Sequence, residues 1–183
     1  MKKLLIIVAP FVLSASPALA QTATGTVAID GSVAGRCLFT TPSATISVGE
    51  MALQGTGTTA GKLNVAVING QTRTLVGWCN GSASTMSVET QALVNTGFAP
   101  AAPAGFDKVV DYTATAVANA VSANDTSLTA SAGAASSVGL FTGNVVVTLS
   151  AASSPTSGLL IAGGYQGQVL VTLSPAIALP PPT

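Results

Sequence analysis

The chain has 183 residues, of which 48% are hydrophobic and only 7% are charged, a composition too apolar for a disordered chain. Six Lys or Arg balance six Asp or Glu, so no basic patch favours nucleic acid and no polybasic segment favours anionic lipid. The absence of His removes the usual base of a nucleophilic triad. The many Ala, Thr, Ser, Gly and Val residues favour an all-β fold.

The first twenty residues have the three parts of an export signal. Two lysines follow the initial Met, residues 4–13 form a short apolar run, and residues 18–20 read Ala-Leu-Ala, a cleavage site of small residues. The apolar run is too short to span a membrane. We therefore expect a signal peptide over residues 1–20, cleavage before Gln21, export, and no direct membrane insertion. The rest of the chain suits one domain.

Residues 25–33 alternate apolar with polar or small side chains. Val27, Ile29 and Val33 fall on one face of an extended strand, and Gly31 lies between them on the same face. The segment has few neighbours in sequence with which to pair. It is therefore either the first strand of its own β-sandwich or a strand that docks on another molecule.

Cys37 and Cys79 are the only cysteines. An even count in an exported chain predicts one disulfide, whereas a metal site built on two cysteines would lack further ligands without His. The disulfide would close a long loop, for which the chain-entropy model gives about 4 kcal/mol of stabilisation.

Alternation and turn residues divide the rest of the chain into short strands. Asn-Gly at residues 69–70 predicts a tight hairpin turn, and Asn-Asp at residues 124–125 predicts a second turn. Residues 114–123 are rich in Ala but alternate, so we expect a strand there rather than a short helix. Residues 99–105 and 131–137 are predicted to be loops. The other predicted strands cover residues 44–48, 62–69, 72–78, 84–90, 107–115 and 144–150.

The last predicted strand lies in residues 163–173, which read Gly-Gly-Tyr-x-Gly-x-Val-x-Val-Thr-Leu. Val169, Val171 and Leu173 share one face of this strand. Residues 175–183 continue as a Pro-rich tail, and because prolines cannot donate to a ladder, we expect no further strand there.

The pattern Gly-Thr-Val-x-apolar-x-Gly-x-Val in residues 25–33, followed by Cys37, resembles the N-terminal extension of chaperone–usher pilins. The ending in residues 163–173 is similar to the last strand of pilins and of spore-coat-U-like pilin domains. The resemblance thus covers both ends of the exported chain and the cysteine pair. It departs from the family in the tail, since pilins usually end within a residue or two of the last strand.

This resemblance implies an all-β fold, an incomplete immunoglobulin-like β-sandwich over residues 35–174, with an N-terminal donor-strand extension over residues 21–34. It implies a fimbrial subunit at the cell surface, partnered by identical or related subunits, a periplasmic chaperone and an outer-membrane usher. The implied donor positions are Gly25, Val27, Ile29, Gly31 and Val33. The implied edge of the receiving groove is Val169, Val171 and Leu173, and the implied structural cysteines are Cys37 and Cys79.

Two other functions stay open. One is a self-contained secreted β-sandwich that binds a partner, such as a surface adhesin or a lectin-like domain. The other is a secreted hydrolase that uses Asp107 and Asp111, which an even spacing places on one face of a strand. Because exposed carboxylates are the norm, we expect these two residues, like Arg36 and Arg73, on the solvated surface. We expect no enzyme, no cofactor and no metal.

Overall fold

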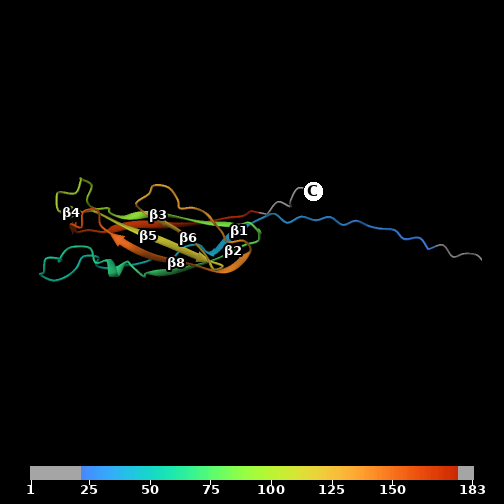
Figure 1. The fold of residues 1–183 in the computed structure, drawn as a ribbon, viewed down its shortest axis with the longest axis horizontal. Helices are drawn as coiled ribbons and strands as arrows, with labels where there is room; N and C mark the ends of the chain where they lie inside the picture. Colours follow the sequence, from blue (N-terminus) through green and yellow to red (C-terminus); the bar gives the residue numbers. More distant parts are fainter. Residues whose placement is uncertain (1–21, 177–183) are drawn as a thin grey trace, which may run out of the picture. The chain divides into compact units, whose positions relative to one another are not determined.

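The computed structural model (Figure 1) describes residues 22–176. The predicted signal peptide, its cleavage site and most of the Pro-rich tail lie outside the described residues. The chain divides into two units, Met1–Val33 and Ala34–Thr183. Within residues 22–176, no helix combines the length and the apolar composition needed to cross a membrane.

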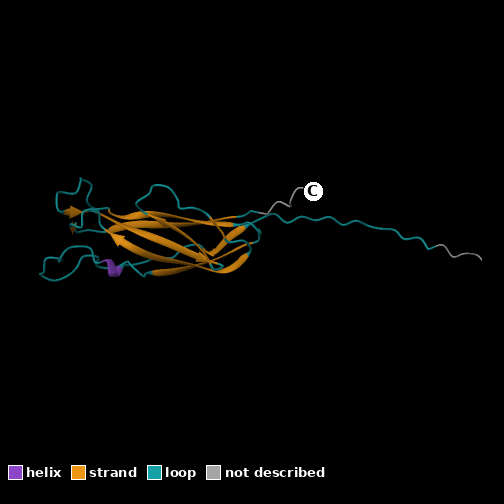
Figure 2. Cartoon of the chain, viewed as in Figure 1, coloured by secondary structure: helices purple, strands orange, loops and turns teal. Residues whose placement is uncertain are grey.

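In the first unit, residues 22–33 form no regular secondary structure (Figure 2), and every one of them is exposed. Val27, Ile29 and Val33 expose 85%, 92% and 85% of their surface. The expected strand over residues 25–33 is therefore not formed within the described chain. A strand persists only where its N–H and C=O groups are paired, so this segment keeps a strand-forming pattern without a ladder.

The regular secondary structure of the second unit is almost entirely β-strand, joined by loops (Figure 2). Its strands are β1 (Cys37–Thr41), β2 (Thr72–Cys79), β3 (Thr85–Asn95), β4 (Phe106–Asp107), β5 (Val109–Ala118), β6 (Val121–Thr126), β7 (Ser136–Ser137), β8 (Phe141–Ser153), β9 (Leu159–Leu160) and β10 (Tyr165–Ser174). One 3-10 turn, η1 (Val65–Val67), lies between β1 and β2, and the described residues contain no α-helix. The all-β prediction is confirmed.

Eight of the strands form one antiparallel sheet that nearly closes on itself. Their order is β1-β2-β8-β5-β3-β10, with β6 paired to β5 and β7 paired to β3. The strands β4 and β9 form a separate parallel pair. Because β1 and β10 are the two ends of the order, a seam remains between them that no ladder of described strands seals.

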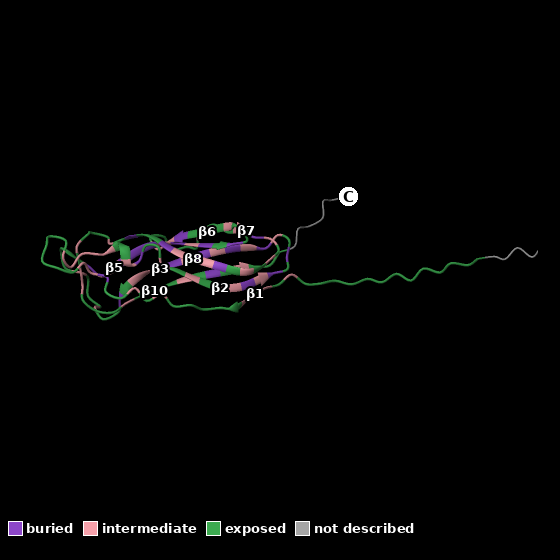
Figure 3. Ribbon diagram, turned by 90° about the horizontal axis from the view of Figure 1, so that it is seen from below, coloured by how far each residue is buried: buried purple, intermediate pink, exposed green. Residues whose placement is uncertain are grey.

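Alternation along the central strands places one face of the sheet in the core. On β8, Val145, Val147 and Leu149 are buried, whereas the residues between them are only half-buried. β5 repeats the pattern with small side chains, since its buried positions after Tyr112 are alanines. Figure 3 shows the same alternation of buried and more exposed positions along the strands. The strand predicted over residues 144–150 is confirmed.

The predicted disulfide between Cys37 and Cys79 is formed, and it joins directly opposed residues of β1 and β2. Just beyond it, Asn80 extends the pairing with its side chain. The amide nitrogen of Asn80 donates to the carbonyl of Ala34, and its amide oxygen accepts from the backbone N–H of Arg36. The start of β1 is therefore held by one covalent bond and by side-chain hydrogen bonds.

Two predicted strands before β2 are not formed. Residues 44–48 belong to no strand. In residues 62–69, isolated bridges at Lys62 and Leu63 give way to η1, whose start is capped by the Asn64 side chain accepting from the N–H of Ala66. The cap favours a tight turn over continued extension, because it satisfies a backbone donor locally.

The turn predicted at residues 124–125 is also wrong, because these residues lie inside β6. Asp125 is buried, and its carboxylate accepts from the backbone N–H of Thr90 on β3. The reversal occurs earlier, at Asn119 and Ala120, both of which have positive φ. Asn-Asp is a turn signal only where its side chains bond their own backbone, and here Asp125 bonds another strand.

Candidate functional site

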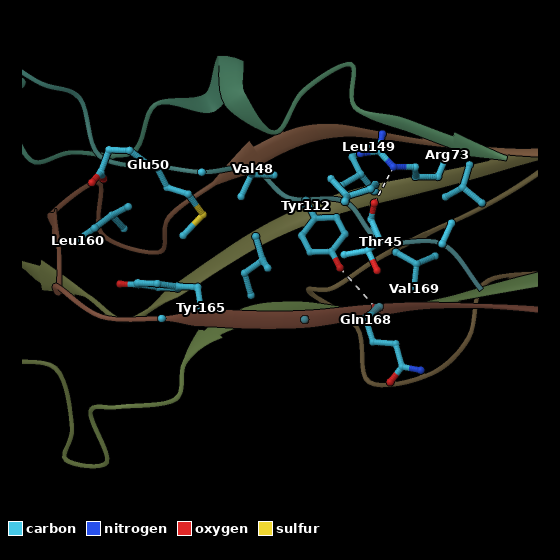
Figure 4. A pocket seen from close by; sticks show the side chains of 18 of the residues that line it. Thr45, Val48, Glu50, Arg73, Tyr112, Leu149, Leu160, Tyr165, Gln168 and Val169 are labelled. Atoms are coloured by element: carbon cyan, nitrogen blue, oxygen red, sulfur yellow. Dashed lines mark hydrogen bonds between the residues drawn. The ribbon is translucent and has the colours of Figure 1, made fainter.

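A groove of about 1140 Å³ follows the seam of the second unit (Figure 4). Residues 42–50 form one wall, and residues 51–55 extend the lining from its end. Residues 160–171, which include most of β10, form the other wall. Side chains from β2, β5 and β8, among them Leu75, Tyr112 and Leu149, line it between these walls. The groove therefore opens where the sheet order ends.

The β10 wall has a strand partner on one side only. β10 pairs with β3 from Tyr165 to Ser174, and no other described strand pairs with it. Val169 is half-buried and Val171 is buried, and both line the groove. Leu173 lies outside the groove, against Gly77 of β2, where an added Cβ would come within 3.4 Å of the Leu173 Cδ1. An edge of unpaired backbone thus runs beside the apolar part of the groove.

The opposite wall, residues 42–50, has no strand ladder. Within the described residues, its backbone makes no hydrogen bond to another backbone group. Ile46 and Val48 are half-buried and pack against the core. Arg73 of β2 donates from Nε to the carbonyl of Thr45 at 2.6 Å, as Figure 4 shows. Arg73 is half-buried beside the groove, which corrects the expectation that it lies on the solvated surface.

Between the walls, the Tyr112 hydroxyl lies close to two carbonyls. It is 2.8 Å from the oxygen of Gln91 on β3 and 3.3 Å from the oxygen of Gln168 on β10 (Figure 4), and it has one proton to donate to them. The second contact lies where the register of β10 shifts, between Gln166 and Gln168. Burial raises the pKa of Tyr112 to about 12, so the phenol is neutral at physiological pH.

The groove lining is mostly apolar, glycine or uncharged polar, and it contains two charged residues, Glu50 and Arg73. The Glu50 carboxylate accepts from the backbone N–H of Ala52 at 2.8 Å. The Arg73 guanidinium is bonded to backbone carbonyls. Because the rest of the lining is uncharged, the groove suits an extended partner that offers apolar side chains and backbone groups.

The prediction that Asp107 and Asp111 lie on a solvated face is wrong. They are 3% and 7% exposed, and they belong to different strands, β4 and β5. The Asp111 carboxylate accepts from the Ser127 hydroxyl. Burial of Asp107 opposes its ionisation, but hydrogen bonds from Gly158 and Thr156 outweigh burial and lower its pKa below the ordinary 3.8. Both carboxylates hold neighbouring segments in place.

Sequence reasoning missed Arg73 and Tyr112 as groove residues. For Arg73 a signal was present, because it shares the apolar face of a predicted strand with Leu75 and Cys79 at even spacing. A charge on such a face needs a partner. For Tyr112 no local signal exists, since its contacts are on β3 and β10, far away in sequence.

In residues 22–176, no group of three or more His, Cys, Asp or Glu side chains could hold a metal ion. No protein-family model, no curated protein and no solved structure matches the chain. The groove and the sequence pattern of residues 22–33 are therefore the features of this chain that point to a function.

Proposed function

We propose that this chain is a fimbrial subunit that polymerises by donor-strand exchange. In this proposal the second unit is an immunoglobulin-like β-sandwich that lacks one strand. Residues 22–33 of a neighbouring copy supply the missing strand by entering the groove. The product is a fibre on the cell surface that supports adhesion or biofilm formation.

The observation that carries the proposal is the apolar groove beside the unpaired edge of β10. A row of unpaired N–H and C=O groups is a template for another strand. Apolar surface beside this edge stabilises a bound strand whose alternate side chains are buried against it. One partner segment could satisfy both needs, since its backbone completes the ladder while its side chains fill the groove.

The first unit has the pattern that such a partner needs. Val27, Ile29 and Val33 recur at even spacing and are almost fully exposed. Burying one such side chain is worth roughly 1.5–3 kcal/mol, so three of them make a substantial driving force. Residues 27–33 span about 20 Å when extended, which is comparable to the reach of β10 from Tyr165 to Val171. Gly25 and Gly31 add positions without side-chain bulk.

The proposal also implies assembly partners. A subunit with an empty groove exposes an apolar strip and a free strand edge, which promote aggregation. A periplasmic chaperone that covers the groove, and an outer-membrane usher at which exchange takes place, would resolve that problem. The signal-peptide pattern of residues 1–20 is consistent with this route.

The test compares two substitutions at adjacent positions of the full chain. Ile29→Asp places a charge on the apolar face of the donor segment, whereas Ala28→Asp places the same charge on its polar face. We expect the unchanged chain and Ala28→Asp to form ladders on an unboiled denaturing gel, and Ile29→Asp to remain monomeric in gel filtration. Both positions are exposed, so neither change affects folding of the second unit.

Two results would contradict the proposal. One is ladder formation by Ile29→Asp equal to that of the unchanged chain. The other is an unchanged chain that stays a stable monomer at every concentration and whose second unit unfolds when residues 21–33 are removed. The second result would favour a self-contained binding module, in which the groove of about 1140 Å³ takes a different ligand.

A further inference from the structure

The two edges of β2 are used to different extents. On one edge, β8 pairs with β2 along its whole length, from Thr72 to Cys79. On the other edge, β1 pairs only with residues 76–79. Residues 72–75 therefore present an edge that no described strand occupies.

Residues 42–50 directly follow β1 and have a sequence that could occupy that edge. Ile46 and Val48 alternate with small polar residues, which is the pattern of a strand. The segment nevertheless makes no ladder with residues 72–75. One side chain of β2, that of Arg73, is hydrogen-bonded to this segment in place of a ladder.

The Arg73 guanidinium binds one carbonyl on each side of this gap. Nε donates to the carbonyl of Thr45 in the groove wall, and Nη1 donates to the carbonyl of Thr72 on β2, both at 2.6 Å. Charge-assisted hydrogen bonds are stronger than neutral ones, and the planar fork of arginine holds two acceptors in a fixed geometry. The bridge holds the wall near β2 while leaving the backbone N–H groups of the wall without backbone partners.

We propose that Arg73 is a strap that positions residues 42–50 to pair, through their free backbone groups, with the strand that fills the groove. This inference rests on the proposed function. It adds a second ladder, on the wall opposite β10, and it assigns the order of that wall to a single positioning residue.

The remaining contacts of the wall explain why one residue has this influence. Ile46 and Val48 pack against the core but are only half-buried. Glu50 fixes the far end of the wall through the N–H of Ala52. Without Arg73, the middle of the wall has only two apolar side chains to hold it, so its backbone would have to be ordered during binding. Ordering a segment on binding weakens affinity, whereas a preorganised segment avoids that cost.

The experiment uses the full chain carrying Ile29→Asp, so that its own donor segment does not compete. A synthetic peptide of residues 22–33 is added, and hydrogen exchange is followed separately in residues 43–49 and in β10. In this background we expect the peptide to slow exchange in both regions. With Arg73→Gln added, we expect protection of β10 to persist, protection of residues 43–49 to be lost, and the Kd of the peptide to rise about tenfold.

Arg36→Gln is the matched control, because it removes the same charge from an exposed position. It should leave both regions protected and the Kd unchanged. Arg73→Lys should not restore protection of residues 43–49, since an ammonium lacks the fork that reaches two carbonyls. Thermal melting of each variant distinguishes a local effect on the wall from loss of the fold.

The outcomes separate the strap from the function on which it rests. Equal protection of residues 43–49 in the Arg73→Gln variant and its parent would overturn the strap. Protection of β10 alone in the parent would also overturn it, while leaving donor-strand binding intact. Absence of protection in both regions of the parent would instead reject the groove as a strand-binding site, and the strap with it.

Discussion

The strands at the two ends of the sheet order differ in how they are held. β1 is tied to β2 by the Cys37–Cys79 disulfide, and Asn80 clamps the residues that precede it. β10 is paired only to β3 and borders a groove along its other side. Both are edge strands of one sheet, so the difference cannot be attributed to their place in the order.

The comparison shows where this chain keeps free pairing capacity. An edge fixed covalently to its neighbour stays in one register. An edge that is unpaired and lies beside apolar side chains has unsatisfied backbone groups, which a new strand can satisfy. In the proposed function, the first arrangement anchors the extension of each subunit and the second arrangement receives the extension of the next.

The largest expected effect comes from breaking the anchored edge. Replacing both cysteines, in Cys37→Ala/Cys79→Ala, frees a loop with a sequence separation of 42 residues and should lower the free energy of unfolding by about 4 kcal/mol. Chemical denaturation with fluorescence detection measures the difference. A reducing agent should destabilise the unchanged chain by a similar amount and leave the double variant unaffected. Equal stability of the two proteins under oxidising conditions would contradict the assigned role of the disulfide.

A matched pair of valines tests the open edge against the core. Val88 of β3 is fully buried, whereas Val169 of β10 is half-buried at the groove. Val88→Ala should cost about 2 kcal/mol of folding free energy, because it removes buried apolar surface and leaves a cavity. Val169→Ala should cost less than about 1 kcal/mol. In the proposed function, Val169→Ala should clearly reduce the ladders on an unboiled gel although it lowers the free energy of unfolding only slightly. Equal destabilisation by both changes would mean that the groove side is packed like the core.

The same contrast explains what the sequence could predict. β2, β8 and β10 combine alternation with partners on at least one side, and the pattern predicts the position of each, although β8 extends beyond residues 144–150 at both ends. The disulfide followed from cysteine count and from the predicted export. Residues 44–48 alternate equally well but form no strand. A strand needs a partner edge, whereas alternation shows only that a segment is able to form a strand.

The residues that line the groove are harder to predict from the sequence than the strands are. They come from segments far apart in the chain, and the contacts that define the groove are long-range, such as that of Tyr112 with Gln168. Asp107 and Asp111 were misassigned because a carboxylate is usually exposed, and the partners that allow their burial lie on distant loops or turns. Local pattern thus predicts which segments can pair, and tertiary contacts decide which of them do.

An effect of similarly small size concerns the Tyr112 hydroxyl, which links β10 to the floor of the groove. Tyr112→Phe removes the hydrogen bond to the carbonyls of Gln91 and Gln168, and it should cost about 1 kcal/mol of stability at neutral pH. Because the hydroxyl contacts β10 at its register shift, hydrogen exchange should increase locally around Gln168 and remain unchanged in β8. A uniform increase over the whole sheet would indicate a general loss of packing instead.

The dependence of the free energy of unfolding on pH, measured at alkaline pH, is a second test of the buried Tyr112 hydroxyl. Burial raises the pKa of Tyr112 from its ordinary 10.0 to about 12, so the folded chain holds the phenolic proton more tightly than the unfolded chain does. The stabilisation that accompanies this difference is complete below about pH 10 and is lost as the pH rises through about 12. In Tyr112→Phe, that part of the pH dependence should disappear, which denaturation curves measured between these two pH values would detect. A variant that loses stability with pH as steeply as the unchanged chain would show that Tyr112 is not the group whose titration destabilises the fold.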